Sequence, residues 1–205
     1  NCMSTKFLNQ AYGVSKLDSR TLYTQWSQTY DSEVLENGYV TPLRVADALD
    51  RHVADKTTDL LDYGCGTGLS GQALQNVEFT SIDGVDVTAA MIDLAREKAI
   101  YRNLSVFSPQ DGPNISPGAY RVITAIGVIG AGAAPLTVFD TIMGLLPVGG
   151  KFAFSFNDHT LEDPAYEDKV WDYTRTGRAQ LVFCEYGPHL PGKDMNSNVY
   201  IIVKK

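Results

Sequence analysis

The feature that most constrains the fold of this chain is a regular alternation of short apolar runs with helix-like patterns, which begins near residue 59. Apolar runs of strand length occur at residues 59–63, 79–85, 104–107, 121–126 and 150–156. Helical spacing of apolar residues occurs between them, at residues 69–75, 89–102 and 136–146. Strands that alternate regularly with helices predict an α/β fold with a parallel sheet covered by helices on both faces.

The alternation breaks at the C-terminal end of the chain. A helix is predicted over residues 163–176, with Asp163 as its N-cap and Pro164 at its first position. Two strands are then predicted at residues 180–186 and 198–203, with no helix between them. Two such strands can pair antiparallel at the edge of the sheet. The sequence therefore predicts seven strands, mostly parallel, with an antiparallel C-terminal strand.

Two helices are predicted before this core. The first covers residues 21–36, and the second begins with Thr41 as its cap and Pro42 as its first residue. One face of the second helix is apolar, with Val45, Leu49 and Val53 in line. We expect these helices to cover the carboxyl edge of the sheet, where open α/β sheets bind ligands.

Composition and charge narrow the class of protein. The 205 residues, 44% of them hydrophobic, fit a single globular domain, with residues 1–57 as cap helices and 58–205 as core. The net charge of −7 predicts no nucleic-acid or membrane partner, and leaves a small-molecule substrate. No run of about 18 apolar residues occurs. The three cysteines are widely spaced, which predicts no metal site and favours a reducing, cytoplasmic location.

A glycine-rich turn follows the first strand of the core. Gly64, Gly66 and Gly68 alternate with other residues, so the backbone can approach a ligand closely. The helix predicted to begin near Leu69 would direct its free N–H groups at that ligand. We interpret Cys65 as a small residue of this turn and not as a nucleophile.

Two carboxylates accompany this turn. Asp62, at the end of the first strand, could reach a cationic amine, directly or through water. Asp86 closes the second strand, where a carboxylate can accept hydrogen bonds from two ribose hydroxyl groups. Residues 66–71 also fit the G-x-G-x-x-G fingerprint of dinucleotide-binding folds. The first glycine of that fingerprint should directly follow the strand, and here this is Gly64, which puts Leu69 where the third glycine belongs. The match is therefore out of phase.

Three segments resemble class I S-adenosylmethionine-dependent methyltransferases. Residues 62–68 (DYGCGTG) are similar to the first motif of that family, and residues 84–91 (GVDVTAAM) to the motif that follows. Residues 145–151 (LLPVGGK) are similar to its turn before strand five. The resemblance covers most of residues 59–156 and implies a Rossmann-like, doubly wound sheet with S-adenosylmethionine as the cofactor.

The N-terminal segment adds a narrower resemblance. Tyr23, Trp26, Tyr30, Tyr39 and Pro42 are similar to residues of the methyltransferase-like proteins of the Williams–Beuren syndrome region type. The resemblance implies that Trp26, Tyr30 and Tyr39 help to close the cofactor pocket. Packing of a cap helix would explain the same three aromatic residues equally well.

The resemblance also assigns parts of the cofactor to residues of the core. It implies that Gly64, Cys65 and Gly66 surround the methionine part and that Asp86 holds the ribose. It further places Val87 and Met91 against the adenine, Gln110 or Asp111 at the adenine edge, and Ile126 or Gly127 under the sulfonium. Taken alone, Met91 would be a core residue.

The predicted function is methyl transfer from S-adenosylmethionine to a small or medium-sized acceptor. If the acceptor must lose a proton, His159, Tyr30 and Asp158 are the candidate bases. Two alternatives stay open, namely an NAD(P)-dependent oxidoreductase and a non-catalytic module that binds S-adenosylmethionine.

Overall fold

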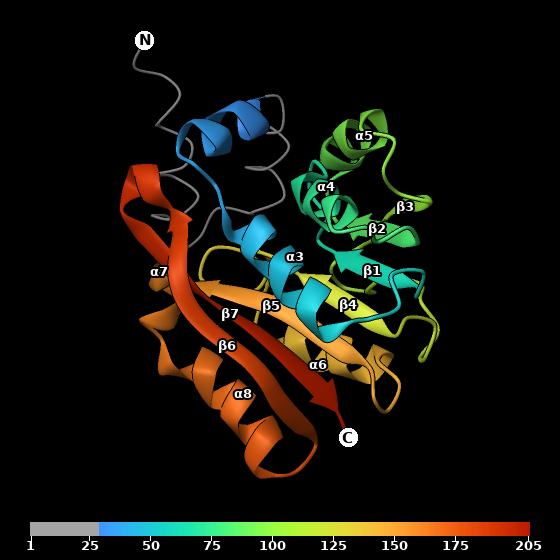
Figure 1. The fold of residues 1–205 in the computed structure, drawn as a ribbon, viewed down its shortest axis with the longest axis vertical. Coiled ribbons are helices and arrows are strands. Elements are labelled where there is room, and N and C mark those ends of the chain that lie inside the picture. Colours follow the sequence, from blue (N-terminus) through green and yellow to red (C-terminus); the bar gives the residue numbers. More distant parts are fainter. Residues whose placement is uncertain (1–28) are drawn as a thin grey trace.

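The computed structural model describes residues 29–205, which form one seven-stranded sheet with helices on both faces (Figure 1). The strand order is β3-β2-β1-β4-β5-β7-β6. The strands are β1 (Leu60–Tyr63), β2 (Ile82–Asp86), β3 (Asn103–Val106), β4 (Val122–Ala125), β5 (Lys151–Asn157), β6 (Ala179–Leu190) and β7 (Met195–Lys204). β1 to β5 pair in parallel, and β7 lies antiparallel between β5 and β6. The predicted α/β architecture is confirmed.

Helices cover the two faces of the sheet in separate groups. The helices are α3 (Thr41–His52), α4 (Leu69–Asn76), α5 (Ala89–Glu97), α6 (Thr137–Leu145), α7 (Asp158–Leu161) and α8 (Pro164–Arg175), with a short 3-10 helix η1 (Pro191–Lys193). Residues of α3 and α4 pack in one apolar cluster, and residues of α6 and α8 pack in another on the opposite face. A further helical segment, at 29–36, precedes α3.

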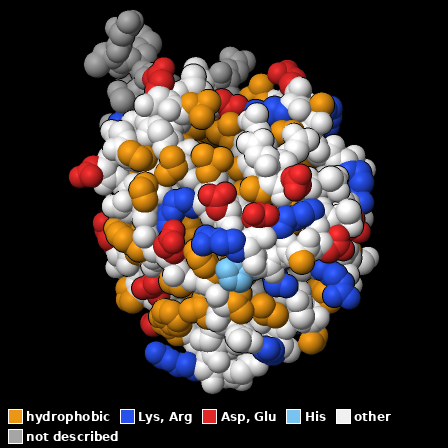
Figure 2. All heavy atoms as spheres, viewed as in Figure 1, with side chains coloured by type: hydrophobic (Ala, Val, Ile, Leu, Met, Phe, Trp, Pro, Cys, Tyr) orange, Lys and Arg blue, Asp and Glu red, His pale blue; other side chains and the backbone are white. Residues whose placement is uncertain are grey.

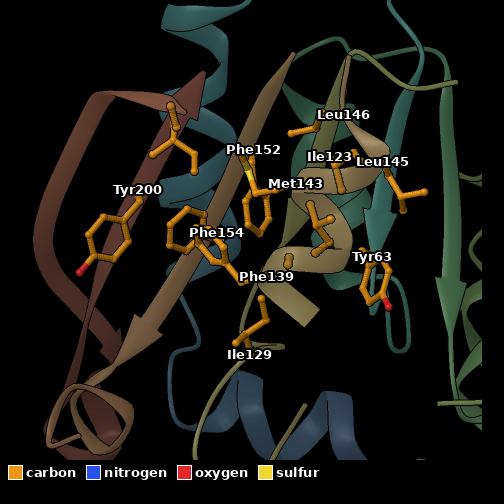
Figure 3. Packing of buried hydrophobic residues seen from close by; sticks show 14 of the residues in the cluster. Tyr63, Ile123, Ile129, Phe139, Met143, Leu145, Leu146, Phe152, Phe154 and Tyr200 are labelled. Carbon is orange, nitrogen blue, oxygen red and sulfur yellow. The ribbon is translucent and has the colours of Figure 1, made fainter. Parts of the chain in front are cut away.

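Alternation along β5 separates these two clusters. Phe152, Phe154 and Phe156 point to the face covered by α6 and α8, whereas Ala153 belongs to the cluster of α3 and α4. Phe139 of α6 meets Phe152 and Phe154 edge-on, with ring centroids 5.3 and 5.2 Å apart (Figure 3). Because the central strands are buried on both faces, their carboxyl edge is held rigidly in place.

The helix predicted over 89–102 is shorter than expected, because α5 ends at Glu97. Ala99 takes a left-handed conformation with φ +53°, which ends the helix. The N–H of Arg102 then donates to the carbonyl of Ile82, and its guanidinium binds both carboxylate oxygens of Asp83. These tertiary contacts override a local sequence that is compatible with a helix.

The N-terminal predictions are met in part. Residues 21–28, including Trp26, lie outside the described residues, and 29–36 is helical. Thr41 is not the cap of α3, because the N-cap is Val40 and makes no side-chain capping bond. The Thr41 hydroxyl is instead buried within hydrogen-bonding distance of His189 Nδ1, at 2.7 Å, and of Ser197 Oγ, at 3.0 Å.

The last two strands are longer than the sequence predicts. β6 continues through Pro188, which was expected in the connecting loop, as far as Leu190. β6 lies at the edge of the sheet, where the missing N–H of a proline breaks no ladder between central strands. The turn itself falls at η1, followed by Asp194 with φ +53°.

The face of the molecule on which α3 lies carries charged side chains of both signs. Figure 2 shows Lys and Arg side chains interspersed with Asp and Glu there, and Lys56 pairs with Asp50 and Arg44 with Glu185. Within residues 29–205, no helix combines the length and the apolar character that a membrane crossing needs.

Candidate functional site

A cavity of about 370 Å³ opens at the carboxyl ends of the parallel strands. Its walls come from the turns that follow β1, β2, β3 and β4, and from residues of the N-terminal segment 30–42. The order of strands reverses between β1 and β4, since β2 lies on one side of β1 and β5 on the far side of β4. Such a switch point is where open α/β sheets bind ligands.

The turn between β1 and α4 forms one wall of this cavity. Gly64, Gly66 and Gly68 have φ values of +72°, +53° and +94°, which residues with a side chain rarely adopt. The N–H groups of Gly64 and Cys65 both donate to the carbonyl of Val85 at the end of β2. A Cβ built on Gly66 would meet no atom within 4 Å, so the backbone here borders open space. We call residues 64–68 the glycine loop.

Asp86 joins the glycine loop to the end of β2. Its Oδ2 accepts the N–H of Gly66 at 2.9 Å, and its Oδ1 accepts the N–H of Thr88 at 2.9 Å. The side chain lines the cavity, and its burial raises the pKa of the carboxyl group. A carboxylate offers about four acceptor positions, so Asp86 can receive further hydrogen bonds from a ligand.

Asp62 lies beneath the glycine loop and is not among the residues that line the cavity. Its carboxylate accepts hydroxyl hydrogen bonds from Ser70 at 2.5 Å, Tyr101 at 2.7 Å and Thr124 at 2.9 Å. Full burial raises the pKa of Asp62, and these hydroxyl groups oppose that rise. Asp62 was expected to reach a ligand amine directly or through water, and its place outside the cavity lining, among the protein's own hydroxyl groups, disfavours the direct contact.

The turns after β2 and β3 bring four predicted residues to one end of the cavity, namely Val87, Met91, Gln110 and Asp111. Phe107 and Pro109 lie there as well, and the sequence analysis assigned them no role. Phe107 packs edge-on against Tyr63, with ring centroids 5.3 Å apart. Phe107 could have been assigned to the cavity from the sequence, because it is an aromatic residue at the end of a predicted strand.

The other end of the cavity lies under the N-terminal segment. Tyr30, Tyr39, Ile126 and Gly127 all line it, as predicted. The hydroxyl of Tyr39 lies 2.7 Å from the position of a Cβ built on Gly127, so the two residues meet closely. No motif marked the rest of this wall, which is formed by Val128, Ala133, Ala134, Pro135, Thr137, Val138 and Thr141.

Two of the three candidate bases lie away from the cavity. Asp158 accepts hydrogen bonds from the Tyr186 hydroxyl and from the N–H of Asn196, both at 2.7 Å, and so ties α7 to the β6–β7 hairpin. His159 faces Glu162, with 3.8 Å between Nδ1 and a carboxylate oxygen, and neither Asp158 nor His159 lines the cavity. Tyr30 is the candidate that does line it.

The charge of the cavity walls has one sign. Among the described residues that line it, the charged side chains are Asp86 and Asp111, and none is Lys, Arg or His. In the same part of the chain, no group of three His, Cys, Asp or Glu side chains is placed to hold a metal ion. The cavity is therefore better suited to a cationic or neutral ligand than to an anionic one.

Comparison with known proteins agrees with this geometry. The family model described as "Methyltransferase domain" matches residues 39–185, which include the whole cavity wall from Tyr39 onward. The chain belongs to this methyltransferase family.

Curated relatives carry related names. Methyltransferase-like protein 27 of Homo sapiens is 27% identical over 143 residues, which cover 68% of this chain and 58% of the relative. Ubiquinone biosynthesis O-methyltransferase of Coxiella burnetii is 28% identical over 147 residues, covering 70% of this chain and 58% of that protein. The chain thus spans somewhat more than half the length of these two methyltransferases.

Solved structures show the same fold at lower identity. The TehB-like SAM-dependent methyltransferase from Corynebacterium glutamicum has 18% identity and a TM-score of 0.59, covering 91% of this chain and 98% of that one. The fold of this chain thus also occurs in a solved structure of similar length.

Proposed function

We propose that this chain binds S-adenosylmethionine and transfers its methyl group to a small or medium-sized acceptor. The observation that carries the proposal is the charge of the cavity, whose described walls hold two carboxylates and no cationic side chain. A sulfonium cation is favoured beside such walls. The position of the glycines argues against the oxidoreductase alternative, because Leu69 stands where the third glycine of the dinucleotide fingerprint belongs.

The residues at the cavity fit the parts of this cofactor. Asp86 would accept hydrogen bonds from the ribose hydroxyl groups, and the glycine loop would border the methionine part. Val87 and Met91 offer apolar contacts for an adenine ring, and Gln110 and Asp111 stand near them with polar groups. The names of the relatives support the same cofactor class.

Methyl transfer mainly requires that the methyl donor and the acceptor are held in line. When bound, S-adenosylmethionine supplies a methyl group activated by the positive sulfur. The chain's own contribution is to hold an acceptor in line with that carbon and to exclude water, tasks for Tyr39, Tyr30 and the wall after β4. If the acceptor must lose a proton, the Tyr30 hydroxyl is the remaining predicted candidate at the cavity.

A small molecule is the proposed acceptor, and not a nucleic acid, because the net charge is −7 and the face in Figure 2 mixes both signs. Cys65 and Cys184 are free thiols, which fits a reducing compartment, and we propose a cytoplasmic location on that basis.

Replacing Asp86 tests the cofactor assignment. We expect Asp86→Ala to weaken the binding of S-adenosylhomocysteine by about 1–3 kcal/mol, because charge-assisted hydrogen bonds are lost. Isothermal titration calorimetry measures this, with Asp93→Ala as the control, since Asp93 is an exposed aspartate of α5. An unchanged affinity in Asp86→Ala would remove the ribose assignment.

A second experiment separates an enzyme from a binding module. The chain is incubated with S-adenosylmethionine labelled in the methyl group and a panel of small hydroxylated, amino and thiol compounds. Label appearing in one of them supports catalysis. Cofactor binding without label transfer to any of them would favour the non-catalytic alternative.

A further inference from the structure

Tyr101 lies in the segment between α5 and β3, with its ring packed against three glycines, Gly68, Gly71 and Gly84, that lie behind the cavity wall. A Cβ built on Gly71 would lie 2.3 Å from the Tyr101 hydroxyl oxygen, and one on Gly84 would lie 2.9 Å from its ring carbon Cδ1. A Cβ on Gly68 would come within 3.3 Å of ring carbon Cε2. Side chains at these positions would collide with the ring or crowd it, so the three glycines make room for it.

The Tyr101 hydroxyl connects the two elements that flank the glycine loop, from a position 30 or more residues further along the chain. It accepts the N–H of Gly71 in the first turn of α4 at 3.1 Å, and it donates to Oδ2 of Asp62 on β1 at 2.7 Å. Ser70 donates to the same carboxylate oxygen. One phenol thus ties the end of β1 to the start of α4, the two elements between which the glycine loop runs.

This contact explains two of the three glycines that resemble a dinucleotide fingerprint. In that fingerprint the third glycine allows a helix and a strand to pack closely. Here a residue larger than glycine at position 71 would force Tyr101 to move, because the phenol occupies the space beside it. Packing on Tyr101 thus accounts for Gly68 and Gly71 without a pyrophosphate, whereas Gly66 borders open space.

We propose that Tyr101 is a positioning residue for the ligand site, and that it holds the glycine loop in its binding conformation from below. The loop's three glycines have no side chains to fix their left-handed conformations, so the loop depends on hydrogen bonds to its backbone and on the elements at its ends. Val85 and Asp86 hold its first half, and Tyr101 supports its ends through Gly71 and Asp62, outside the cavity lining. A loop that is already ordered binds its ligand with a smaller entropic cost. The identity of the ligand rests on the proposed function.

Tyr101→Phe tests this proposal with a matched control. The variant keeps the ring against the glycines and removes only the hydroxyl. Tyr120→Phe removes a hydroxyl that donates to Asp83 at the same distance, 2.7 Å, at a position that does not line the cavity. We expect S-adenosylhomocysteine to bind Tyr101→Phe about 10-fold more weakly than the unmodified chain, and Tyr120→Phe within about 2-fold of it. Equal affinities in the two variants, whether lowered or not, would overturn the proposal.

Hydrogen exchange gives a readout that needs no ligand. In Tyr101→Phe, amide exchange in residues 64–71 should accelerate several-fold, while exchange in β5 and β7 stays as in the unmodified chain. Unchanged exchange in residues 64–71 would contradict the positioning role. If the unmodified chain failed to bind S-adenosylhomocysteine, the proposed function would fall, and this experiment would still decide the role of Tyr101.

Discussion

At the scale of single residues, Gly66 shows how a missing side chain can define a ligand site. Its φ of +53° permits the turn, and a methyl group added there would meet no atom of the protein. The residue nevertheless lines the cavity and donates its N–H to Asp86. Space at this position is therefore available to a ligand, and the protein's own packing does not require it.

Gly66→Ala should separate binding from stability. The left-handed backbone is expected to cost the folded state about 1–2 kcal/mol, and the new methyl group should lower S-adenosylhomocysteine affinity about 10-fold or more. Gly118→Ala is the control, because Gly118 has φ +84°, an equally open surrounding and no place in the cavity lining. Calorimetric titration measures the affinity of both variants, and chemical denaturation measures their stability. Equal losses of affinity in Gly66→Ala and Gly118→Ala would contradict a ligand site at Gly66.

His189 is a second residue whose surroundings predict a measurable property. Its Nδ1 lies 2.7 Å from the Thr41 hydroxyl, and its ring meets that of Tyr39 edge-on at 5.2 Å. Burial lowers the pKa of His189 to about 4, from 6.5 in an exposed histidine. The folded chain therefore holds this imidazole in its neutral form at pH values where an unfolded chain would protonate it.

This difference predicts the direction of a pH effect. Between pH 6.5 and pH 4 the unfolded state binds one more proton at His189, so the free energy of unfolding falls as the pH falls, by up to about 3 kcal/mol. Urea unfolding at several pH values should show a shallower fall in His189→Gln than in the unmodified chain. Identical slopes in the two proteins would contradict the assignment.

The sequence motifs predicted which residues lie at one edge of the sheet. Gly66, Asp86 and Met91 line the cavity because each lies at or shortly after the end of a strand at that edge, and their contacts with a cofactor stay a prediction. Asp158 also follows a strand, yet its carboxylate binds the tip of the β6–β7 hairpin. Its two partners, Tyr186 and Asn196, lie 28 and 38 positions further along the chain, so no local sequence pattern could predict the contact.

At the scale of elements, two helical glycines differ in what surrounds them. Gly71 in α4 faces the Tyr101 phenol, whereas a Cβ built on Gly144 in α6 would meet nothing within 4 Å. Both positions have helical backbone, so propensity alone would favour alanine at each. Because of this difference in packing, we expect alanine to change the free energy of unfolding in opposite directions at the two positions.

We expect Gly71→Ala to lower the free energy of unfolding by about 1–3 kcal/mol, because Tyr101 must move to admit the methyl group. Gly144→Ala should raise it by about 0.5–1 kcal/mol, since alanine loses less backbone entropy on folding. Chemical denaturation measures both changes. Stabilisation by Gly71→Ala would show that Tyr101 does not occupy that space.

The same region shows where prediction of elements stopped. Apolar runs sufficed for β1, β2, β4 and β5, because these strands are buried on both faces. β3, at the edge of the sheet, is largely exposed and was predicted from its place in the alternation. The end of α5 could not be predicted, since it depends on Tyr101 reaching Asp62 and Arg102 reaching Asp83. Pro188 likewise suggested a loop, and only the position of β6 at the sheet edge allows it within a strand.

At the scale of the whole molecule, the cavity is assembled from both halves of the sheet and closed by the N-terminal segment. Asp86 comes from one side of the strand-order reversal, Gly127 from the other, and Tyr39 lies over Gly127. The N-terminal segment is held in place by Asp31, which pairs with Lys98 at 2.6 Å. The order of the strands made the location predictable, whereas this closing contact joins residues far apart in sequence.

The central claim is that the cavity accepts a sulfur-containing nucleoside and refuses a dinucleotide. Isothermal titration of the same preparation with S-adenosylhomocysteine and with NAD⁺ tests it most directly. We predict saturable binding of S-adenosylhomocysteine with one site per chain, and no heat of binding for NAD⁺. Saturable binding of NAD⁺ together with no response to S-adenosylhomocysteine would contradict the account.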